Sequence, residues 1–332
     1  MNTDSISFQS VLDALTSSGK DFPRRYLQQF SDIDPLELKT LLDVWPSVNT
    51  NRKVTLLEGL RILAEEDTLV NFDDFARAIL NDPDPAVQIR AIRLLSECED
   101  TKLASTFLAM LKKDADIHVR VEAAHALGLF VDLGELEEIS ESIYRQIEDA
   151  LLAVAGGEDD PHVRRAALES LGYSSRIEVS TLIESSFHRE DPAWQASALV
   201  AMGRSVDERW EEDVLRSLVN VNDNVRLVAV QAAGNLELKS ARTILLRMLN
   251  EEEDDSVLNA VIWSLSQIGG EDVRTYLENL LDQTEDEELI AYLEEALDNL
   301  AFTEDLDRFD LLALDTDVDL DLAEIDEDEE EK

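Results

Sequence analysis

Cysteine, proline, glycine and aromatic residues are all scarce in this chain of 332 residues. The single cysteine, Cys98, excludes an internal disulfide, and the cytoplasm is the compartment that we expect. The 7 prolines, the 11 glycines and an aromatic share of 6% leave few helix breakers and little of the material of a β-sandwich. Hydrophobic residues make up 44% of the chain, which is enough for a core. The composition therefore predicts an all-α protein.

Long apolar runs are absent as well. No stretch of about 18 consecutive apolar residues occurs, so we expect no membrane-spanning helix. The opening residues, MNTDSISFQSVLDAL, have neither the basic patch nor the apolar run of a signal peptide. Cys98 lies in the segment LLSECED, which offers no basic residue or histidine to activate a thiolate. We therefore interpret it as a partly buried, unreactive thiol.

Positive charge is also in short supply. The chain has 74 acidic against 29 basic residues, and its formal net charge is −45. Because such a surface repels phosphate groups, we expect neither nucleic acid nor membranes as partners. The charge favours instead a partner protein with a basic surface. It is also typical of proteins from a salty cytoplasm, and the sequence leaves both interpretations open.

What the chain does contain is a repeat. The segment DDPHVRRAALESLG at 159–172 returns as EDPAWQASALVAMG at 190–203. Both have an apolar anchor, with an aspartate three residues before it, an alanine four residues after it and a leucine or methionine eight residues after it. Seven segments fit this frame, and their anchors are Val87, Val119, Val163, Trp194, Val225, Val257 and Leu289.

The frame predicts an amphipathic helix in each repeat. Residues at i, i+4 and i+8 lie on one helical stripe, and the aspartate or asparagine before the anchor is a favoured N-terminal cap. A glycine nine residues after the anchor looks like a helix stop. We therefore predict that four first helices end at Gly128, Gly172, Gly203 and Gly234.

A second amphipathic segment follows each of these helices, so each repeat is predicted to be a helical hairpin. The clearest second helices are 102–113, 178–187, 209–220, 240–250 and 271–282. Anchors are 31 or 32 residues apart, except for 44 between Val119 and Val163. We place this surplus in a lengthened second helix preceded by an extra turn or a short helix. Stacked hairpins with this period predict an α-α superhelix, a solenoid.

Three parts follow from this pattern. Residues 1–80 are an N-terminal helical cap with degenerate repeats, with helices expected at 6–17, 22–30, 35–45, 52–65 and 72–80. Residues 81–302 are the solenoid of about seven repeats. Residues 303–332 contain 15 acidic and 2 basic residues, so we expect a disordered acidic C-terminal tail. Whether this tail is a binding motif or a solubilising segment stays open.

The phrase D-P-x-V-R-x-A-A-x-x-x-L-G, most complete at 160–172, resembles bacterial HEAT-like repeats of the phycobilisome-lyase type. The resemblance covers about 220 residues and implies that the arginine after the anchor ties neighbouring repeats together. That arginine is present as Arg120, Arg164 and Arg226. Members of the family include interaction scaffolds, bilin lyase subunits and an iron-dependent hydroxylase marked by His-Glu dipeptides. No His-Glu dipeptide occurs here, so the resemblance implies binding rather than oxidation.

Catalytic motifs are missing. The chain has no G-x-S-x-G, P-loop, G-x-G-x-x-G or C-x-x-C sequence. His118 and His162 precede the anchor of consecutive repeats, but no further metal ligands recur in phase with them. We interpret them as exposed residues at helix starts, and we expect no catalytic residue, cofactor or metal.

Arginine and aromatic residues meet at two matching turns. Trp210, Arg209 and Arg204 lie in or beside the segment GRSVDERW, and Tyr173 and Arg176 occupy the same turn one repeat earlier. This combination is typical of interface hot spots. The alternative is that Trp210 fills a gap in the core and that the arginines pair with nearby acids.

These observations favour a cytoplasmic, monomeric and non-enzymatic scaffold or adaptor. We expect it to bind a protein partner on a concave face formed by the second helices. The alternative is a lyase-like or chaperone subunit that positions a prosthetic group, such as a bilin, on a client protein. The sequence does not name the partner or the pathway.

Overall fold

The structure is a computed structural model that describes the backbone of residues 7–17 and 21–323, and their side chains except those of 271 and 306–323. Within these residues every regular element is a helix, which confirms the predicted all-α class. The chain divides into two compact units, one up to Leu182 and one from Ile183. Each unit is described by itself.

The first unit opens with the helices that the sequence predicts for residues 1–80. They are α1 (Phe8–Thr16), the 3₁₀ helix η1 (Arg24–Phe30), α2 (Pro35–Val44), the short 3₁₀ helix η2 (Trp45–Ser47), α3 (Thr50–Glu66) and α4 (Asp73–Ile79). The ring of Phe75 lies 5.1 Å from that of Phe30 and 5.4 Å from that of Trp45, measured between centroids. These aromatic rings form the core of the N-terminal region.

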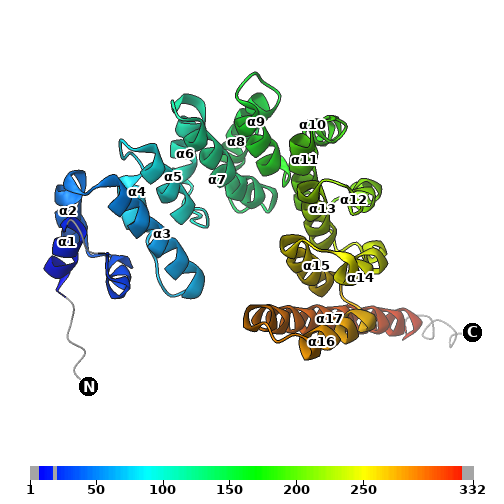
Figure 1. The fold of residues 1–332 in the computed structure, drawn as a ribbon. Coiled ribbons are helices and arrows are strands. Elements are labelled where there is room, and N and C mark those ends of the chain that lie inside the picture. The colour runs from blue at the N-terminus through cyan, green and yellow to red at the C-terminus, as the bar shows by residue number, and fades with distance from the viewer. Residues whose placement is uncertain (1–6, 18–20, 324–332) are drawn as a thin grey trace, which may run out of the picture. The chain divides into compact units, whose positions relative to one another are not determined.

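Regular hairpins follow in the first unit (Figure 1). Their helices are α5 (Pro85–Leu94), α6 (Lys102–Lys113), α7 (Ile117–Glu135), α8 (Glu141–Ala155) and α9 (Pro161–Leu171), and α10 (Ile177–Phe187) spans the boundary between the units. The first helices pack in succession, α3 on α5, α5 on α7 and α7 on α9. The second helices α6 and α8 pack against the first helices that follow them.

The second unit repeats this arrangement. Its helices are α11 (Pro192–Arg204), the 3₁₀ helix η3 (Glu208–Trp210), α12 (Glu211–Ser217), α13 (Asp223–Asn235), the 3₁₀ helix η4 (Lys239–Ala241), α14 (Arg242–Glu251), α15 (Asp255–Ile268), α16 (Glu271–Gln283) and α17 (Glu287–Ala323). The first helices again pack in succession, α11 on α13, α13 on α15 and α15 on α17.

The N-terminal caps are those that the frame predicts. At all seven positions the side chain accepts a hydrogen bond from a backbone N–H in the first turn of its helix. The caps are Asp84, Asp116, Asp160, Asp191, Asn222, Asp254 and Asp286. The central residues of the frame, from Ala91 to Leu293, are completely buried. Each aspartate or asparagine satisfies a backbone donor that has no partner within its helix.

One of the four predicted helix stops is wrong, because α7 continues past Gly128 to Glu135. Gly172 follows the last residue of α9, and Gly203 and Gly234 are the last residue but one of α11 and α13. The reason for glycine at these positions is close packing. A Cβ on Gly203 would lie 3.0 Å from the Cα of Ala232, and one on Gly234 would lie 2.9 Å from the Cα of Ser264. Glycine is needed because the next first helix passes too close for a side chain.

The surplus residues of the long repeat are only partly where the sequence places them. The second helix, α8, is indeed long at 15 residues, but no extra short helix precedes it. Much of the surplus extends the first helix instead, because α7 continues past Gly128 to Glu135 and reaches 19 residues. The continuation buries Phe130, Val131 and Leu133, so apolar contacts stabilise the additional turns.

The backbone of residues 303–323, beyond the predicted boundary at Phe302, is the continuation of α17, and the disorder that the sequence predicts for the acidic tail stays a prediction. This segment contains neither proline nor glycine, and extending an existing helix needs no new nucleus. The remaining residues of the predicted tail, 324–332, lie outside the described residues.

Candidate functional site

Four of the turns that connect the first helix of a repeat to the second carry an exposed apolar side chain. We call the segments 67–72, 136–140, 172–177 and 205–210 the first-to-second turns. They expose Leu69, Leu136, Ile177 and Val206, whose exposed fractions are 87%, 61%, 69% and 78%. Single exposed apolar residues are common on protein surfaces. Here they occur in four separate turns that lead into a second helix, in a chain with a net charge of −45.

Val206 has a strained backbone. Its φ is +47°, a left-handed conformation that β-branched residues rarely adopt. Glu137 and Glu237 adopt the same conformation in other turns of this type, with φ of +60° and +49°. Since glycine would relieve the strain at Val206, we expect the exposed valine to serve a purpose other than the stability of the turn.

The second unit holds three of the five residues that the sequence predicts as a partner-binding site. Trp210 is only 5% exposed and ends the short helix η3, so its indole is part of the core. The guanidinium carbon of Arg209 lies 5.8 Å from the centre of that ring, and Arg209 forms an ion pair with Asp207. Arg204 is half-buried at the end of α11. Of the Arg209–Trp210 pair, the arginine is the exposed member.

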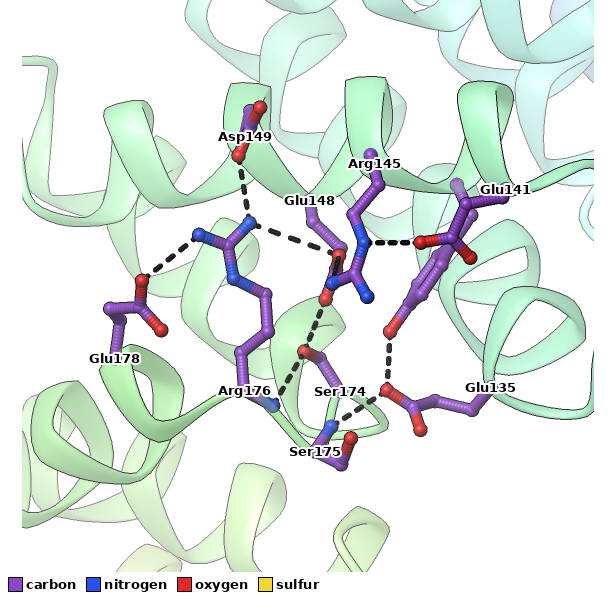
Figure 2. A network of polar contacts seen from close by, with 10 residues as sticks. Glu135, Glu141, Arg145, Glu148, Asp149, Ser174, Ser175, Arg176 and Glu178 are labelled. Carbon is purple, nitrogen blue, oxygen red and sulfur yellow. Dashed lines mark hydrogen bonds and ion pairs between the residues drawn. The ribbon is translucent and has the colours of Figure 1, made fainter.

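The other two predicted residues belong to the first unit. Tyr173 is half-buried just after α9, and Arg176 lies at the end of the same turn. Arg176 donates hydrogen bonds to Asp149 at 2.7 Å and to Glu178 at 3.0 Å (Figure 2). These acceptors raise the pKa of the Arg176 guanidinium above its ordinary value, with Glu178 the largest contributor. Arg176 is therefore paired with nearby acidic residues, which is the alternative that the sequence left open.

Behind Arg176 lies a buried carboxylate, Glu148, whose side chain is completely shielded from solvent. It accepts hydrogen bonds from the hydroxyl of Ser174 at 2.6 Å and from Arg145 at 2.9 Å (Figure 2). A nitrogen of Arg176 lies 3.8 Å from the same carboxylate. Two arginines and a hydroxyl thus compensate the charge of Glu148, which attaches the α9–α10 turn to α8.

Glu135, at the end of α7, connects to the same turn. Its carboxylate accepts hydrogen bonds from the hydroxyl of Tyr144 and from the backbone N–H of Ser175, the latter at 2.7 Å. Burial and the neighbouring carboxylates, first Glu135, raise the pKa of Tyr144 well above its ordinary value. The Tyr144 hydroxyl therefore stays a donor. This network around Glu135 and Glu148, which the sequence does not predict, fixes the turn that carries Ile177.

Arginine rungs connect neighbouring repeats at the opposite turns, those that lead from a second helix into the next first helix. Arg120 donates to Asp159 of the following repeat at 2.8 Å. Arg226 binds both carboxylate oxygens of Glu252 in the following repeat, at 2.7 and 3.0 Å. These two rungs have the role that the family resemblance implies. The third arginine, Arg164, donates instead to the carbonyl of Ala155, at the end of the second helix of the preceding repeat.

The fold gives Cys98 a neighbour that the local sequence does not reveal. A terminal nitrogen of Arg77, from α4, lies 3.0 Å from its Sγ. Burial nevertheless raises the pKa of the Cys98 thiol above its ordinary value, and the nearby carboxyl group of Asp73 raises it further. The thiol is therefore protonated at neutral pH, as expected for an unreactive cysteine.

Among residues 7–17, 21–270 and 272–305, no three His, Cys, Asp or Glu side chains gather as a metal site would require. His162 lies 2.9 Å from the carboxylate of its own cap, Asp160, and His118 is exposed. None of the described helices combines the length and the apolar character that crossing a membrane requires.

Comparison with protein families gives a match over two segments, 74–139 and 212–298, to the family model described as HEAT repeats. The helical hairpins of these two segments are HEAT repeats. The two matched segments include hairpins of both units, and with the helices described above they make the fold an all-helical HEAT-repeat solenoid. No curated protein sequence matches this HEAT-repeat chain significantly.

Several solved structures are similar to this chain at low sequence identity. YibA of E. coli is 17% identical with a TM-score of 0.42, and the match covers 85% of this chain and 98% of YibA. Human deoxyhypusine hydroxylase is 14% identical with a TM-score of 0.35, covering 79% and 95% of the two chains. Kap95 in its complex with Nup1 is 12% identical with a TM-score of 0.44, covering 89% of this chain and 46% of Kap95. At these scores the similarities say nothing about function.

Proposed function

We propose that this HEAT-repeat protein is a non-enzymatic scaffold or adaptor that binds a partner protein with a basic surface. HEAT-repeat solenoids are commonly protein-binding scaffolds. We also propose that these repeats are of the phycobilisome-lyase type, which they resemble in sequence. Because the chain has a net charge of −45, a basic partner is favoured electrostatically. We place the scaffold in the cytoplasm and expect it to act as a monomer.

One observation carries the proposal, the recurrence of exposed apolar residues at the first-to-second turns. Leu69, Leu136, Ile177 and Val206 stand among charged groups, as apolar contacts within a polar rim do in protein interfaces. At Val206 the exposed side chain is kept at the expense of backbone strain. The prediction of a second-helix face thereby becomes a more specific proposal, in which the partner contacts the turns that lead into the second helices.

The test compares two sets of substitutions at exposed apolar residues. The first set replaces Leu69, Leu136, Ile177 and Val206 by serine, and the matched control replaces Leu36, Tyr276 and Phe302, which lie outside these turns. Full-length proteins are used to capture partners from native lysate, and circular dichroism confirms that each variant keeps its helices. The partners retained by the wild type should be lost with the turn variant and retained with the control.

Capture of the same proteins by the wild type, the turn variant and the control would refute the proposed surface. The alternative of a lyase-like subunit is distinguished on the purified protein itself. A carrier of a bilin would absorb visible light after reconstitution with the pigment and would melt at a higher temperature. A scaffold would show neither effect.

A further inference from the structure

A cavity of about 590 Å³ opens in the second unit, on the turns that lead from a second helix into the next first helix. Its walls come from the end of α12, the start of α13, the end of α14 and the segment 252–254 before α15. Such a volume is in the range of sites that hold a few side chains or a small ligand. The cavity is distinct from the first-to-second turns of the proposed function.

Acidic residues dominate the wall of the cavity. Five carboxylates, those of Asp223, Glu251, Glu252, Glu253 and Asp254, face two guanidinium groups, so the formal charge of the lining is −3. Glu252 and Asp223 already neutralise Arg226, whose side chain donates four hydrogen bonds that occupy most of its N–H groups. Hydrogen bonding from Arg226 also holds the pKa of Glu252 below its ordinary value, so this carboxylate is ionised.

The floor of the cavity is apolar. Leu218 and Met248 lie at its base and are almost completely buried. Val219 lines the opening with 62% of its surface exposed, and Val221, two residues further along the same loop, is 97% exposed. An apolar floor and rim within an acidic wall favour a ligand that carries positive charges beside an aliphatic group.

We propose that this cavity binds a short, extended segment of a partner protein in which a lysine or arginine stands next to an aliphatic residue. The basic side chain lies beside Glu251 and Glu253, and the aliphatic side chain covers Val219 and Met248. This inference rests on the proposed function in one respect, that the chain binds a protein with a basic surface. It adds a second contact point, which a flexible tail or loop of that partner can reach.

The test must separate this cavity from the general attraction of an acidic protein for any basic peptide. Two short fluorescein-labelled peptides of equal positive charge serve as probes. One carries leucines between its lysines and arginines, and the other carries serines in their place. Fluorescence anisotropy with the full chain should show that the leucine peptide binds more tightly than the serine peptide.

Three variants then locate the site. Val219→Asp makes the protein more negative, so binding by general charge attraction alone would become tighter. If the leucine peptide contacts Val219, loss of that apolar contact should instead weaken its binding about fivefold. Glu253→Lys should weaken both peptides about fivefold, because it reverses a charge of the wall. The matched control is Glu294→Lys on α17, an equal charge change at an exposed residue outside the cavity. It should change binding less than about twofold.

Two results would overturn the cavity. One is equal or tighter binding of the leucine peptide to Val219→Asp, and the other is the same loss from Glu253→Lys and Glu294→Lys. Either result leaves the proposed function untouched, because partner capture through the first-to-second turns is measured with different variants. Conversely, if binding of the leucine peptide depends on Val219 and Glu253, the cavity is established as a binding site even if the turn variants keep their partners.

Discussion

The ring of Tyr144 packs directly against the backbone of Gly134, so that a Cβ at Gly134 would overlap the ring. Gly134 lies inside α7, where alanine would ordinarily stabilise a helix by about 1 kcal/mol. Tyr144 is buried and bonded to Glu135, so its ring has little freedom to move aside. We expect Gly134→Ala to lower the free energy of unfolding by about 1–2 kcal/mol, as overpacked cores do. Denaturation by urea, followed by circular dichroism, measures this change.

Gly59→Ala is the matched control for this prediction. Gly59 also lies inside a helix, α3, and an added Cβ would meet only the side chain of Leu27, at 3.3 Å. Because that side chain can adjust, Gly59→Ala should be neutral or stabilising. Equal effects of the two substitutions would show that the contact between Tyr144 and Gly134 does not constrain the fold.

A buried ion pair connects the N-terminal region to the first repeat. The ammonium of Lys53 lies 2.7 Å from the carboxylate of Asp82, and the indole N–H of Trp45 donates to the same oxygen at 2.8 Å. We expect Lys53→Met to cost about 3 kcal/mol in unfolding free energy, because it leaves a buried carboxylate without its counter-charge. The double variant Lys53→Met/Asp82→Asn removes both charges and should recover about half of that loss. Thermal unfolding of both variants tests the coupling.

The same pair predicts a dependence on pH. Burial raises the pKa of Asp82, but hydrogen bonds from Lys53, from the backbone N–H of Asp84 and from Trp45 outweigh burial and leave it below 3.8. The folded state therefore holds the proton less tightly than the unfolded state, so stability from the pair is complete above about pH 4. It is lost as the pH falls further. The difference in unfolding free energy between wild type and Asp82→Asn should shrink below pH 4, and a constant difference would contradict the assignment.

Ser170 offers the opposite test, a substitution that stabilises. Its hydroxyl is completely buried against Gly128 and has no hydrogen-bond partner among the described residues. An unsatisfied buried hydroxyl costs about 1–3 kcal/mol, and alanine fits the same space. We expect Ser170→Ala to raise the melting temperature in differential scanning calorimetry. A lower melting temperature would mean that the hydroxyl has a role in the packing of α7 and α9.

Val206 connects stability to the proposed function. Val206→Gly relieves a left-handed conformation that costs an L-residue about 1–2 kcal/mol. Glycine loses more conformational freedom on folding, which offsets about 0.5–1 kcal/mol of this gain in stability. The variant should therefore be slightly more stable than wild type, yet retain less partner in the capture experiment. Thermal melts and capture from the same preparation measure the two effects. A destabilised Val206→Gly would show that the valine serves the fold.

The sequence predicts those features of the fold that depend on neighbouring positions along one helix. The caps from Asp84 to Asp286 and the buried stripe both follow from spacings of three, four and eight residues, and both are confirmed. The role of glycine could not be predicted in this way. Gly172 ends a helix whereas Gly203 and Gly234 admit a neighbouring helix, and the same position of the frame serves both purposes.

The features that the sequence does not predict depend mostly on contacts between residues far apart in the chain. Lys53 and Trp45 meet Asp82 from 29 and 37 residues away, in a region that departs from the frame. Arg176 was predicted beside aromatic residues, but its partners Asp149 and Glu178 could be chosen only after folding, since carboxylates are abundant throughout the chain. Whether Trp210, Arg209, Arg204, Tyr173 and Arg176 bind a partner stays a prediction.

The close approach of glycine to a small residue has a consequence for how such a chain grows. Gly203 against Ala232 and Gly234 against Ser264 are sterically equivalent seams, each formed by the same two positions of the frame. Either seam fits a following module that has alanine or serine at the position of Ala232 and Ser264. Duplicating such a module of 31 or 32 residues therefore creates another copy of a seam that already fits.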